Sequence, residues 1–267
     1  MIIVLLLGLT VGVILALTGA GGGILAVPLL VFGVGLSMAE AGPIGLLAVG
    51  LASTLGAVIG LKNGTVRYKA ALLIAGAGIV CSPLGLWLAQ RTPNRPLTIM
   101  FAFVLMYVAF RVYQRSLTPS TESKTPVISK PPPCLLDANR GKLNWTAPCA
   151  WALTASGIVA GGLSGLLGVG GGFVMVPALQ RYTNLTAQSV LATSLAVIAL
   201  VSISGVAASS AAGHLQWAVA IPFSIGALAG MICGRFVAAK LSGPNLQKGF
   251  AIVSAVVAVA LLVKAIQ

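Results

Sequence analysis

Two glycine clusters interrupt long apolar stretches of the chain and suggest a backbone binding site. Each is followed by a Val-Pro pair, Val27-Pro28 in the first copy and Val176-Pro177 in the second. Glycine permits positive φ angles and close approach of a ligand to the backbone. A short helix that starts after such a break directs free N–H groups and its positive dipole end at the break, which favours an anion. The candidate substrate ligands are Gly19, Gly21, Gly22, Gly23, Gly168, Gly170, Gly171 and Gly172.

Hydroxyl side chains inside the apolar stretches are the second group of candidates, because they can donate hydrogen bonds to oxyanions. Ser53 falls on Ser202 when the sequence is shifted by 149 positions, the spacing from Gly19 to Gly168. Thr193 and Ser194 fall on apolar or glycine positions, which predicts an asymmetric site. Hydrogen bonding of a hydroxyl to its own helix carbonyls is the alternative role. The expected fold places Thr193 and Ser194 beside the second cluster and makes them the strongest of the four.

Charged side chains within the apolar stretches are few. Arg235 lies in an apolar segment and is either an anion ligand with bidentate geometry or a side chain that snorkels to the membrane interface. Glu40 and His214 are the candidates for ion coupling, and each has a structural alternative. Glu40 would complement a helix dipole, and His214 would be an ordinary turn residue.

The register between the clusters extends over some ninety residues without a gap and indicates a duplicated unit. The matched pairs include Gly56 with Gly205, Gly64 with Gly213, Tyr68 with Trp217, Gly85 with Gly234, and Phe101 with Phe250.

Composition places this duplicated unit in a lipid bilayer. Hydrophobic residues make up 58% of the chain, charged residues only 7%, and the mean hydropathy is +1.05, which is typical of a polytopic membrane protein. We expect an all-α fold of about eight transmembrane helices in two homologous four-helix repeats, each with a glycine-broken helix. The expected spans cover 1–18, 41–61, 70–89, 96–115, 147–167, 188–211, 217–240 and 245–266, with half-helices at 24–34 and 173–180.

Three regions follow from this pattern: a first transmembrane repeat (1–115), a Pro-rich basic linker (116–146) and a second transmembrane repeat (147–267). The linker is expected to be flexible and cytoplasmic. A tally of basic residues, which counts Arg111 and the linker as cytoplasmic, favours both termini inside. Four crossings per half predict halves of the same orientation. A full crossing by a glycine-flanked segment would invert them, and both arrangements stay open.

The net charge of +13 does not indicate nucleic-acid binding, since the basic residues are scattered over short loops. Four cysteines, Cys81, Cys134, Cys149 and Cys233, show no C-x-x-C spacing, so we expect no metal and no cofactor. Cys134 and Cys149 are interpreted as unpaired, with pairing left open. An enzyme would need a nucleophile, a metal cluster or a carboxylate pair near the spans, and the sequence shows none.

The duplicated pattern G-x-G-G-G-x-x-x-V-P, with a Gly-x-x-x-aromatic turn at Gly64–Tyr68 and again at Gly213–Trp217, resembles the TauE/SafE sulfite exporter family. The resemblance covers 17–110 and 166–260 and leaves the linker unmatched. It implies a transporter, expected to act as an exporter, in the cell (inner) membrane. Its substrates would be sulfur-containing or organic anions such as sulfite or sulfonates.

The expected partners are a small anionic substrate and the lipid bilayer, with no nucleic acid, and a homo-oligomer stays open. The membrane potential, worth roughly 2.3 kcal/mol per charge per 100 mV, is the expected driving force for an outgoing anion. An anion channel, or a permease of the same fold for carboxylates or other small solutes, is the alternative function.

Overall fold

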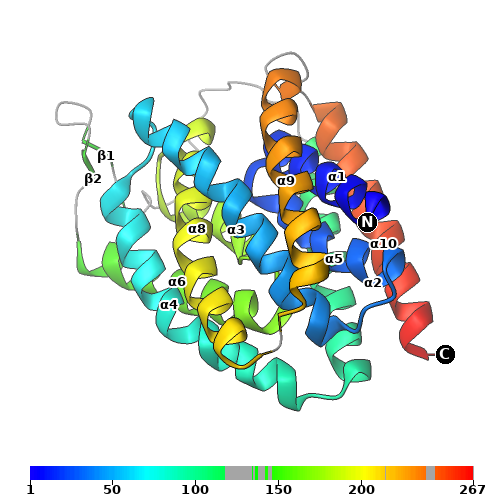
Figure 1. The fold of residues 1–267 in the computed structure, drawn as a ribbon. Helices are drawn as coiled ribbons and strands as arrows, with labels where there is room; N and C mark the ends of the chain where they lie inside the picture. Colours follow the sequence, from blue (N-terminus) through cyan, green and yellow to red (C-terminus); the bar gives the residue numbers. More distant parts are fainter. Residues whose placement is uncertain are drawn as a thin grey trace.

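The computed structural model describes residues 1–117, 134, 136–137, 142–143, 146–213, 215–238 and 244–266, and this part of the chain is almost entirely helical (Figure 1). The first half contains α1 (Ile2–Thr18), the 3-10 helix η1 (Gly19–Leu25), α2 (Ala26–Gly33), α3 (Met38–Lys62), α4 (Tyr68–Arg91) and α5 (Asn94–Leu117). A short hairpin, β1 (Leu136–Asp137) and β2 (Lys142–Leu143), precedes the second half. The second half contains α6 (Ala147–Leu167), α7 (Gly172–Tyr182), α8 (Ala187–Ala211), α9 (Trp217–Ala238) and α10 (Pro244–Ile266).

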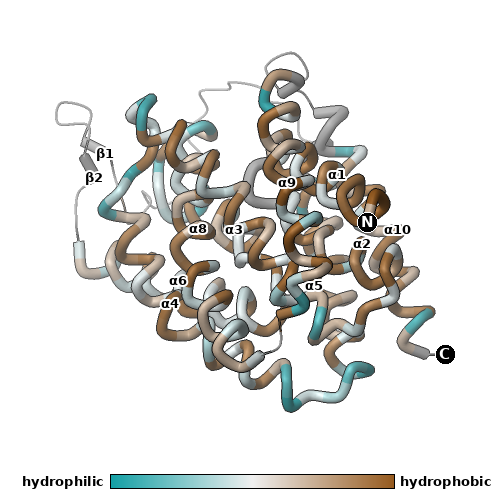
Figure 2. The backbone as a smooth tube through the Cα atoms, viewed as in Figure 1, coloured by the Kyte–Doolittle hydropathy of each residue, from teal (hydrophilic) through white to brown (hydrophobic). Residues whose placement is uncertain are grey.

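Within the described residues, seven helices are long and apolar enough to cross a membrane: α3, α4, α5, α6, α8, α9 and α10. Figure 2 shows that hydrophobic residues predominate along these helices and that several hydrophilic residues lie at helix ends and turns. The expected first span is the 17-residue helix α1, which falls below the length of a full span, and Gly22–Gly33 is shorter still. The all-helical expectation is confirmed, with seven long spans in place of about eight.

The first glycine cluster turns the chain back on itself. A Cβ atom built on Gly22 would lie 2.5 Å from the backbone nitrogen of Leu15, and one on Gly33 would lie 2.5 Å from a methyl carbon of Leu7. Gly22 faces Leu15 and Gly33 faces Leu7, so the chain after the cluster runs antiparallel to α1 and returns beside it. The segment Ile2–Gly33 is therefore a helical hairpin that enters and leaves at the same end of the bundle.

Glycine contacts also fix the directions of the other helices. Gly226, Gly230 and Gly234 of α9 meet α1 at Leu5, Leu9 and Val13 in turn, so α1 and α9 run parallel. In the same way α4 and α6 run parallel, with Gly157 on Ile74, Gly161 on Gly78 and Gly165 on Ser82. The central helices α3 and α8 are antiparallel, with Gly50 on Ser202, Gly56 on Leu195 and Gly205 on Leu46.

Hydrogen bonds define one end of the bundle, called here the terminal end. Gln216 at the start of α9 donates to Glu40 near the start of α3 at 2.9 Å. Near the end of α10, the Lys264 ammonium donates to the Val31 carbonyl at 3.2 Å, and the Ala265 carbonyl accepts from Arg95 at 3.2 Å. The opposite end, called the linker end, holds the end of α5 and the start of α6.

The start of α1 and the end of α10 lie at one end of the bundle, and the end of α5 and the start of α6 lie at the other. The hairpin α1–η1–α2 is followed by three further passes, α3, α4 and α5, so the first half starts at the terminal end and finishes at the linker end. The second half runs in the reverse direction and returns the chain to the terminal end. The sequence tally assumed four passes per half, because the return of α2 leaves no hydropathy signal of its own.

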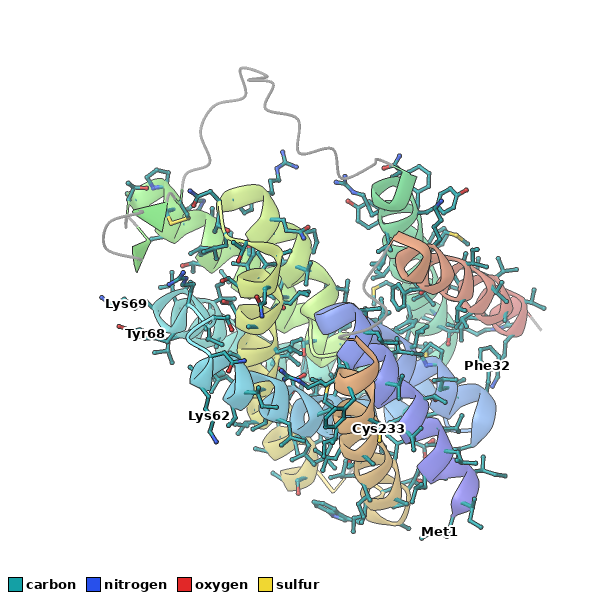
Figure 3. The ribbon with its side chains drawn as sticks, turned by 90° about the horizontal axis from the view of Figure 1, so that it is seen from above. Met1, Phe32, Lys62, Tyr68, Lys69 and Cys233 are labelled. Carbon is teal, nitrogen blue, oxygen red and sulfur yellow. A yellow bond between two sulfur atoms is a disulfide. The ribbon has the colours of Figure 1, made fainter. Side chains whose placement is uncertain are left out.

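The interpretation of Cys134 and Cys149 as unpaired is wrong in this structure, where the two form a disulfide. The backbone N–H of Cys134 donates to the Tyr182 carbonyl at 3.1 Å. This contact brings Cys134 to the end of α7, beside the start of α6, where Cys149 is buried. Cys81 and Cys233 are free. Figure 3, viewed from above, draws the disulfide near the start of α6.

Adjacent glycines on α6 provide a matched test of the close packing between α4 and α6. A Cβ atom on Gly161 would overlap the backbone of Gly78, whereas one on Gly162 would meet nothing within 4 Å. Overpacking costs about 1–3 kcal/mol, so Gly161→Ala should lower the apparent Tm of the purified protein by several degrees. Gly162→Ala should leave it unchanged or raise it slightly. Equal effects of the two variants in a thermal-unfolding assay would contradict this packing.

Candidate functional site

The two glycine clusters meet near the middle of α3. A Cβ atom on Gly23 would lie 3.0 Å from the Val49 side chain and 3.1 Å from the Val169 carbonyl oxygen. A Cβ atom on Gly170 would lie 3.5 Å from the same valine and 3.8 Å from the Ser202 hydroxyl oxygen of α8. Segments 149 positions apart are thus brought together where α3 crosses α8.

The two clusters differ in backbone conformation. The first is the 3-10 helix η1, which contains Gly19, Gly21, Gly22 and Gly23 and leads directly into α2. In the second, Gly168, Gly170 and Gly171 take positive φ angles of 69°, 76° and 67°, and α7 begins only at Gly172. Similar glycine patterns therefore form a tight helix in one half and an open, left-handed turn in the other.

The start of α7 places backbone N–H donors at the second cluster. The first hydrogen bonds into this helix come from the N–H groups of Val174 and Met175, both to the Gly171 carbonyl, at 3.1 and 3.2 Å. The N–H groups of Gly172 and Phe173 precede them, at the positive end of the helix dipole. This geometry suits an anion.

Buried hydroxyl groups surround the same place. Ser53 and Ser202 are completely or almost completely buried, and neither hydroxyl has a hydrogen-bond partner among the described residues. Ser82 and Ser164 are also fully buried and unpartnered. Ser82 lies against Gly205, one turn from Ser202 on α8, and the Ser164 carbonyl caps Gly168 at 2.8 Å. A buried hydroxyl without a partner is costly, so these groups are suited to a polar ligand.

Thr193 and Ser194, which we expected to be the strongest hydroxyl ligands, already have partners. The Thr193 hydroxyl oxygen accepts a hydrogen bond from the backbone N–H of Arg67 at 3.1 Å. The Ser194 hydroxyl donates to the Leu191 carbonyl at 2.8 Å, which is the back-bonding alternative. Thr193 therefore ties the α3–α4 turn to α8, whereas the Ser202 hydroxyl has no described partner.

Arg235 lies in the last turn of α9 at the linker end, next to Gly234, which packs on Val13 and Ala16. Its position matches the snorkelling alternative.

Glu40 forms a capping box with Ser37, whose N–H and hydroxyl donate to it at 3.0 and 2.7 Å. It also accepts from Gln216, as described above, so its carboxylate links the two halves at the terminal end. His214, the other coupling candidate, lies outside the described residues.

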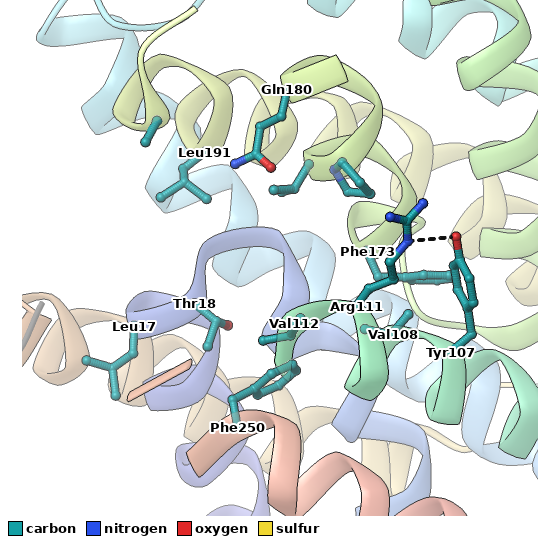
Figure 4. A pocket seen from close by; sticks show the side chains of 13 residues that line it. Leu17, Thr18, Tyr107, Val108, Arg111, Val112, Phe173, Gln180, Leu191 and Phe250 are labelled. Carbon is teal, nitrogen blue, oxygen red and sulfur yellow. Dashed lines mark hydrogen bonds between the residues drawn. The ribbon is translucent and has the colours of Figure 1, made fainter. Parts of the chain in front are cut away.

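A cavity of about 270 Å³ opens at the linker end beside the second cluster (Figure 4). Helices from both halves line it, and Phe173 on its wall directly follows Gly172. The lining residues are Leu17, Thr18, Tyr107, Val108, Arg111, Val112, Phe173, Val176, Pro177, Gln180, Ala187, Leu191 and Phe250.

Arg111 is the charged residue of this lining. Its Nε–H donates to the Tyr107 hydroxyl at 3.0 Å, and its guanidinium carbon lies 5.6 Å from the centre of the Tyr107 ring. Figure 4 shows Arg111, Gln180 and Thr18 around the cavity, each from a different helix. In the sequence, Arg111 was interpreted only as a basic residue on the cytoplasmic side. The pattern that could have indicated a further role is the i, i+4 pair Tyr107–Arg111 inside an apolar helix.

These features define a class. Apolar spans enclose a glycine-built break, and a cavity lined by the neighbouring Phe173 lies towards one end of the bundle, an arrangement typical of membrane transporters. The model of the family described as "Sulfite exporter TauE/SafE" matches residues 4–261. The chain belongs to this family, whose members are transporters rather than enzymes.

Relatives support the same class. A probable membrane transporter protein of Xylella fastidiosa (strain Temecula1) is 27% identical over 265 residues, covering 95% of this chain and 90% of the relative. The probable membrane transporter protein YunE of Bacillus subtilis (strain 168) is 26% identical over 265 residues, covering 90% and 89%. No solved structure matches the chain.

Thermal stability should distinguish Thr193, whose hydroxyl is hydrogen-bonded, from Ser202, whose hydroxyl has no described partner. Thr193→Val removes a buried acceptor and leaves the Arg67 N–H without it, which should cost about 1–3 kcal/mol and lower the apparent Tm. Ser202→Ala removes a hydroxyl that bonds to no described group and should leave the apparent Tm close to wild type. Thermal unfolding of both purified variants in detergent checks this. If Ser202→Ala is as destabilising as Thr193→Val, Ser202 is a structural residue.

Proposed function

We propose that the protein carries small sulfur-containing or organic anions, such as sulfite or sulfonates, out of the cell across the membrane. The observation that carries this proposal is the second glycine cluster, where α7 begins just after Gly170, whose Cβ atom would lie 3.8 Å from the unpartnered Ser202 hydroxyl oxygen. The backbone N–H groups at the start of α7 and the Ser202 hydroxyl can all donate hydrogen bonds. No carboxylate is among the residues that line the adjoining cavity, so nothing there repels an anion.

The substrate is proposed to bind where the two clusters meet. Gly172 and Phe173 supply backbone donors, and Ser202 and Ser53 supply hydroxyls. Oxyanions such as sulfite present several acceptor oxygens to such a set, and a site enclosed by apolar helices strengthens each hydrogen bond. The first cluster, as a continuous 3-10 helix, supports this site from the side of Gly23 rather than forming a second one.

The two halves are proposed to be inverted repeats related by an axis in the membrane plane. The gapless 149-residue register matches α1 with α6, α3 with α8, and α4 with α9. Two observations support this relation: α3 runs antiparallel to its own counterpart α8, and the parallel packing of α1 on α9 is repeated by their counterparts α6 and α4.

The linker end is proposed to face the cytoplasm, which places both termini outside and replaces the expectation of cytoplasmic termini. Basic residues gather there, as the positive-inside rule requires. Lys62, Arg67, Lys69, Arg111, Arg181, Arg235 and Lys248 lie towards the linker end, against Arg91, Arg95 and Lys264 towards the terminal end. Disulfides are rare in the cytosol, so the Cys134–Cys149 disulfide at this end favours the opposite orientation, and fusion reporters decide between the two.

Fusions to the C-terminus test this orientation. With Gln267 outside the cytoplasm, a bacterial alkaline phosphatase fusion should be active and a green fluorescent protein fusion exported through the same pathway should be dark. A second pair of fusions after Leu117, at the linker end, should give the opposite result. A fluorescent, phosphatase-inactive C-terminus would reverse the assignment.

Flux in proteoliposomes tests the function. Labelled sulfite should exchange with saturable kinetics, and a negative potential on the substrate side should accelerate its exit, whereas a pH gradient alone should not. Ser202→Ala should lower kcat/KM by roughly 10-fold, the equivalent of about 1.4 kcal/mol of lost binding. Ser254→Ala, which removes another buried and unpartnered hydroxyl on α10, is the matched control and should change little. Single-channel currents would favour a channel, and flux of carboxylates alone would favour a carboxylate permease.

A further inference from the structure

We propose that the Arg111 cavity is an anion-recruitment site that serves only the linker face, and that its counterpart at the terminal face is an apolar seal. The inference rests on the proposed transport function and on the inverted relation of the halves. Together, the recruitment site and the seal predict that substrate enters from the linker face and that the terminal face is closed.

The first observation is the chemistry of the counterpart positions. In the 149-residue register, each polar residue of the cavity lining corresponds to an apolar residue near the other end of the bundle. Thr18 corresponds to Leu167, Tyr107 to Val256, Arg111 to Ala260 and Gln180 to Val31. At these four lining positions, hydrogen-bonding side chains therefore occur in only one of the two halves' frames. Outside these positions, the Lys264 ammonium donates to the Val31 carbonyl at the terminal end.

The second observation is the burial of the counterpart positions. Pro177, Gln180 and Ala187 are exposed in the cavity. Their counterparts Pro28, Val31 and Met38 are buried, with Val31 at 4% and Met38 at 6% exposure. Val27 and Leu261 are also buried in the main core cluster, whereas their counterparts Val176 and Val112 are only partly buried. The positions of α2 and α3 that match the cavity wall of α7 and α8 are therefore closed by packing, whereas Val256, the counterpart of Tyr107 on α10, is exposed.

Arg111 suits the capture of a small oxyanion. Its Nε–H is held by the Tyr107 hydroxyl, which fixes the side chain, while the terminal N–H groups of a guanidinium keep the fork that matches an oxyanion. The side chain is exposed, so hydration moderates the attraction and the anion can move on to the deeper site. The basic residues that gather towards this end raise the local concentration of anions.

Phe173 marks the path from recruitment to binding. It lines the cavity and directly follows Gly172 at the proposed substrate site. From that site, exit at the terminal face requires separation of the buried set around Val27, Val31 and Met38. Recruitment at one face and an apolar seal at the other favour capture from the linker side, which is the direction of an exporter if that side is cytoplasmic.

Transport measured from each side tests the recruitment site. In proteoliposomes of defined orientation, Arg111→Gln should raise the KM for labelled sulfite presented at the linker face about 10-fold, which corresponds to one lost charged contact. The KM at the terminal face should stay near wild type. Arg111→Lys should recover part of the loss. Arg91→Gln at the terminal end, where Arg91 stacks on Trp87, is the control and should leave both values unchanged.

Cysteine labelling tests the seal without substrate. In a background with Cys81 and Cys233 replaced by serine, Gln180→Cys should react quickly with a membrane-impermeant maleimide, and Val31→Cys should react at least 10 times more slowly.

The outcomes separate the recruitment proposal from the proposed function. A wild-type protein that carries none of the tested anions would overturn the transport function, whatever Arg111 does. Sulfite flux that responds to Arg111→Gln equally at both faces, or at neither, would overturn the recruitment site while leaving transport in place. Equal labelling of the cysteines at positions 180 and 31 would overturn the seal.

Discussion

The structure depends on one constraint: a membrane interior has no water to satisfy exposed backbone N–H and C=O groups. The left-handed turn at Gly168, Gly170 and Gly171 is therefore possible only because α3, α6 and α8 enclose it. Those helices approach closely enough only where small residues meet them, as Gly168 does Gly42 and Gly171 does Ala160. The glycine stripes of α4, α6 and α9 extend the same close packing to the rest of the bundle. Enclosure and packing together create a polar site inside an apolar protein.

In the proposed inverted repeat, the two halves share a frame but differ in the residues that would bind substrate. Both halves carry the same glycine pattern, yet one copy forms the continuous helix η1 and the other an open helix start. The polar lining of the linker-end cavity faces an apolar counterpart across the proposed pseudo-symmetry axis. A symmetric bundle would take up substrate equally from both sides of the membrane. This bundle is proposed to combine a polar cavity at the linker end with packed apolar side chains at the terminal end. The proposed direction of transport follows from residues such as Arg111 and Ala260 at equivalent positions.

Much of the fold could be predicted from sequence, because long apolar runs and an exact repeat register report directly on membrane helices. The 149-position register also predicted that the two glycine clusters meet. The directions of the halves did not, since the return of α2 beside α1 depends on tertiary contacts such as Gly33 on Leu7. Thr193 looked like a ligand because its partner, the N–H of Arg67, lies 126 residues away in sequence. The position of Arg111 in the cavity leaves no local signal in the sequence, because five helices from both halves form the lining.

The central claim is that an anion binds between the start of α7 and Ser202. Selenite has the shape and charge of sulfite, and its selenium scatters anomalously, so a crystal structure of the protein with selenite tests this claim most directly. The claim predicts an anomalous peak within hydrogen-bond distance of the Gly172 or Phe173 N–H groups and of the Ser202 hydroxyl. A peak only at surface arginines or lysines, in crystals grown with saturating selenite, would contradict it.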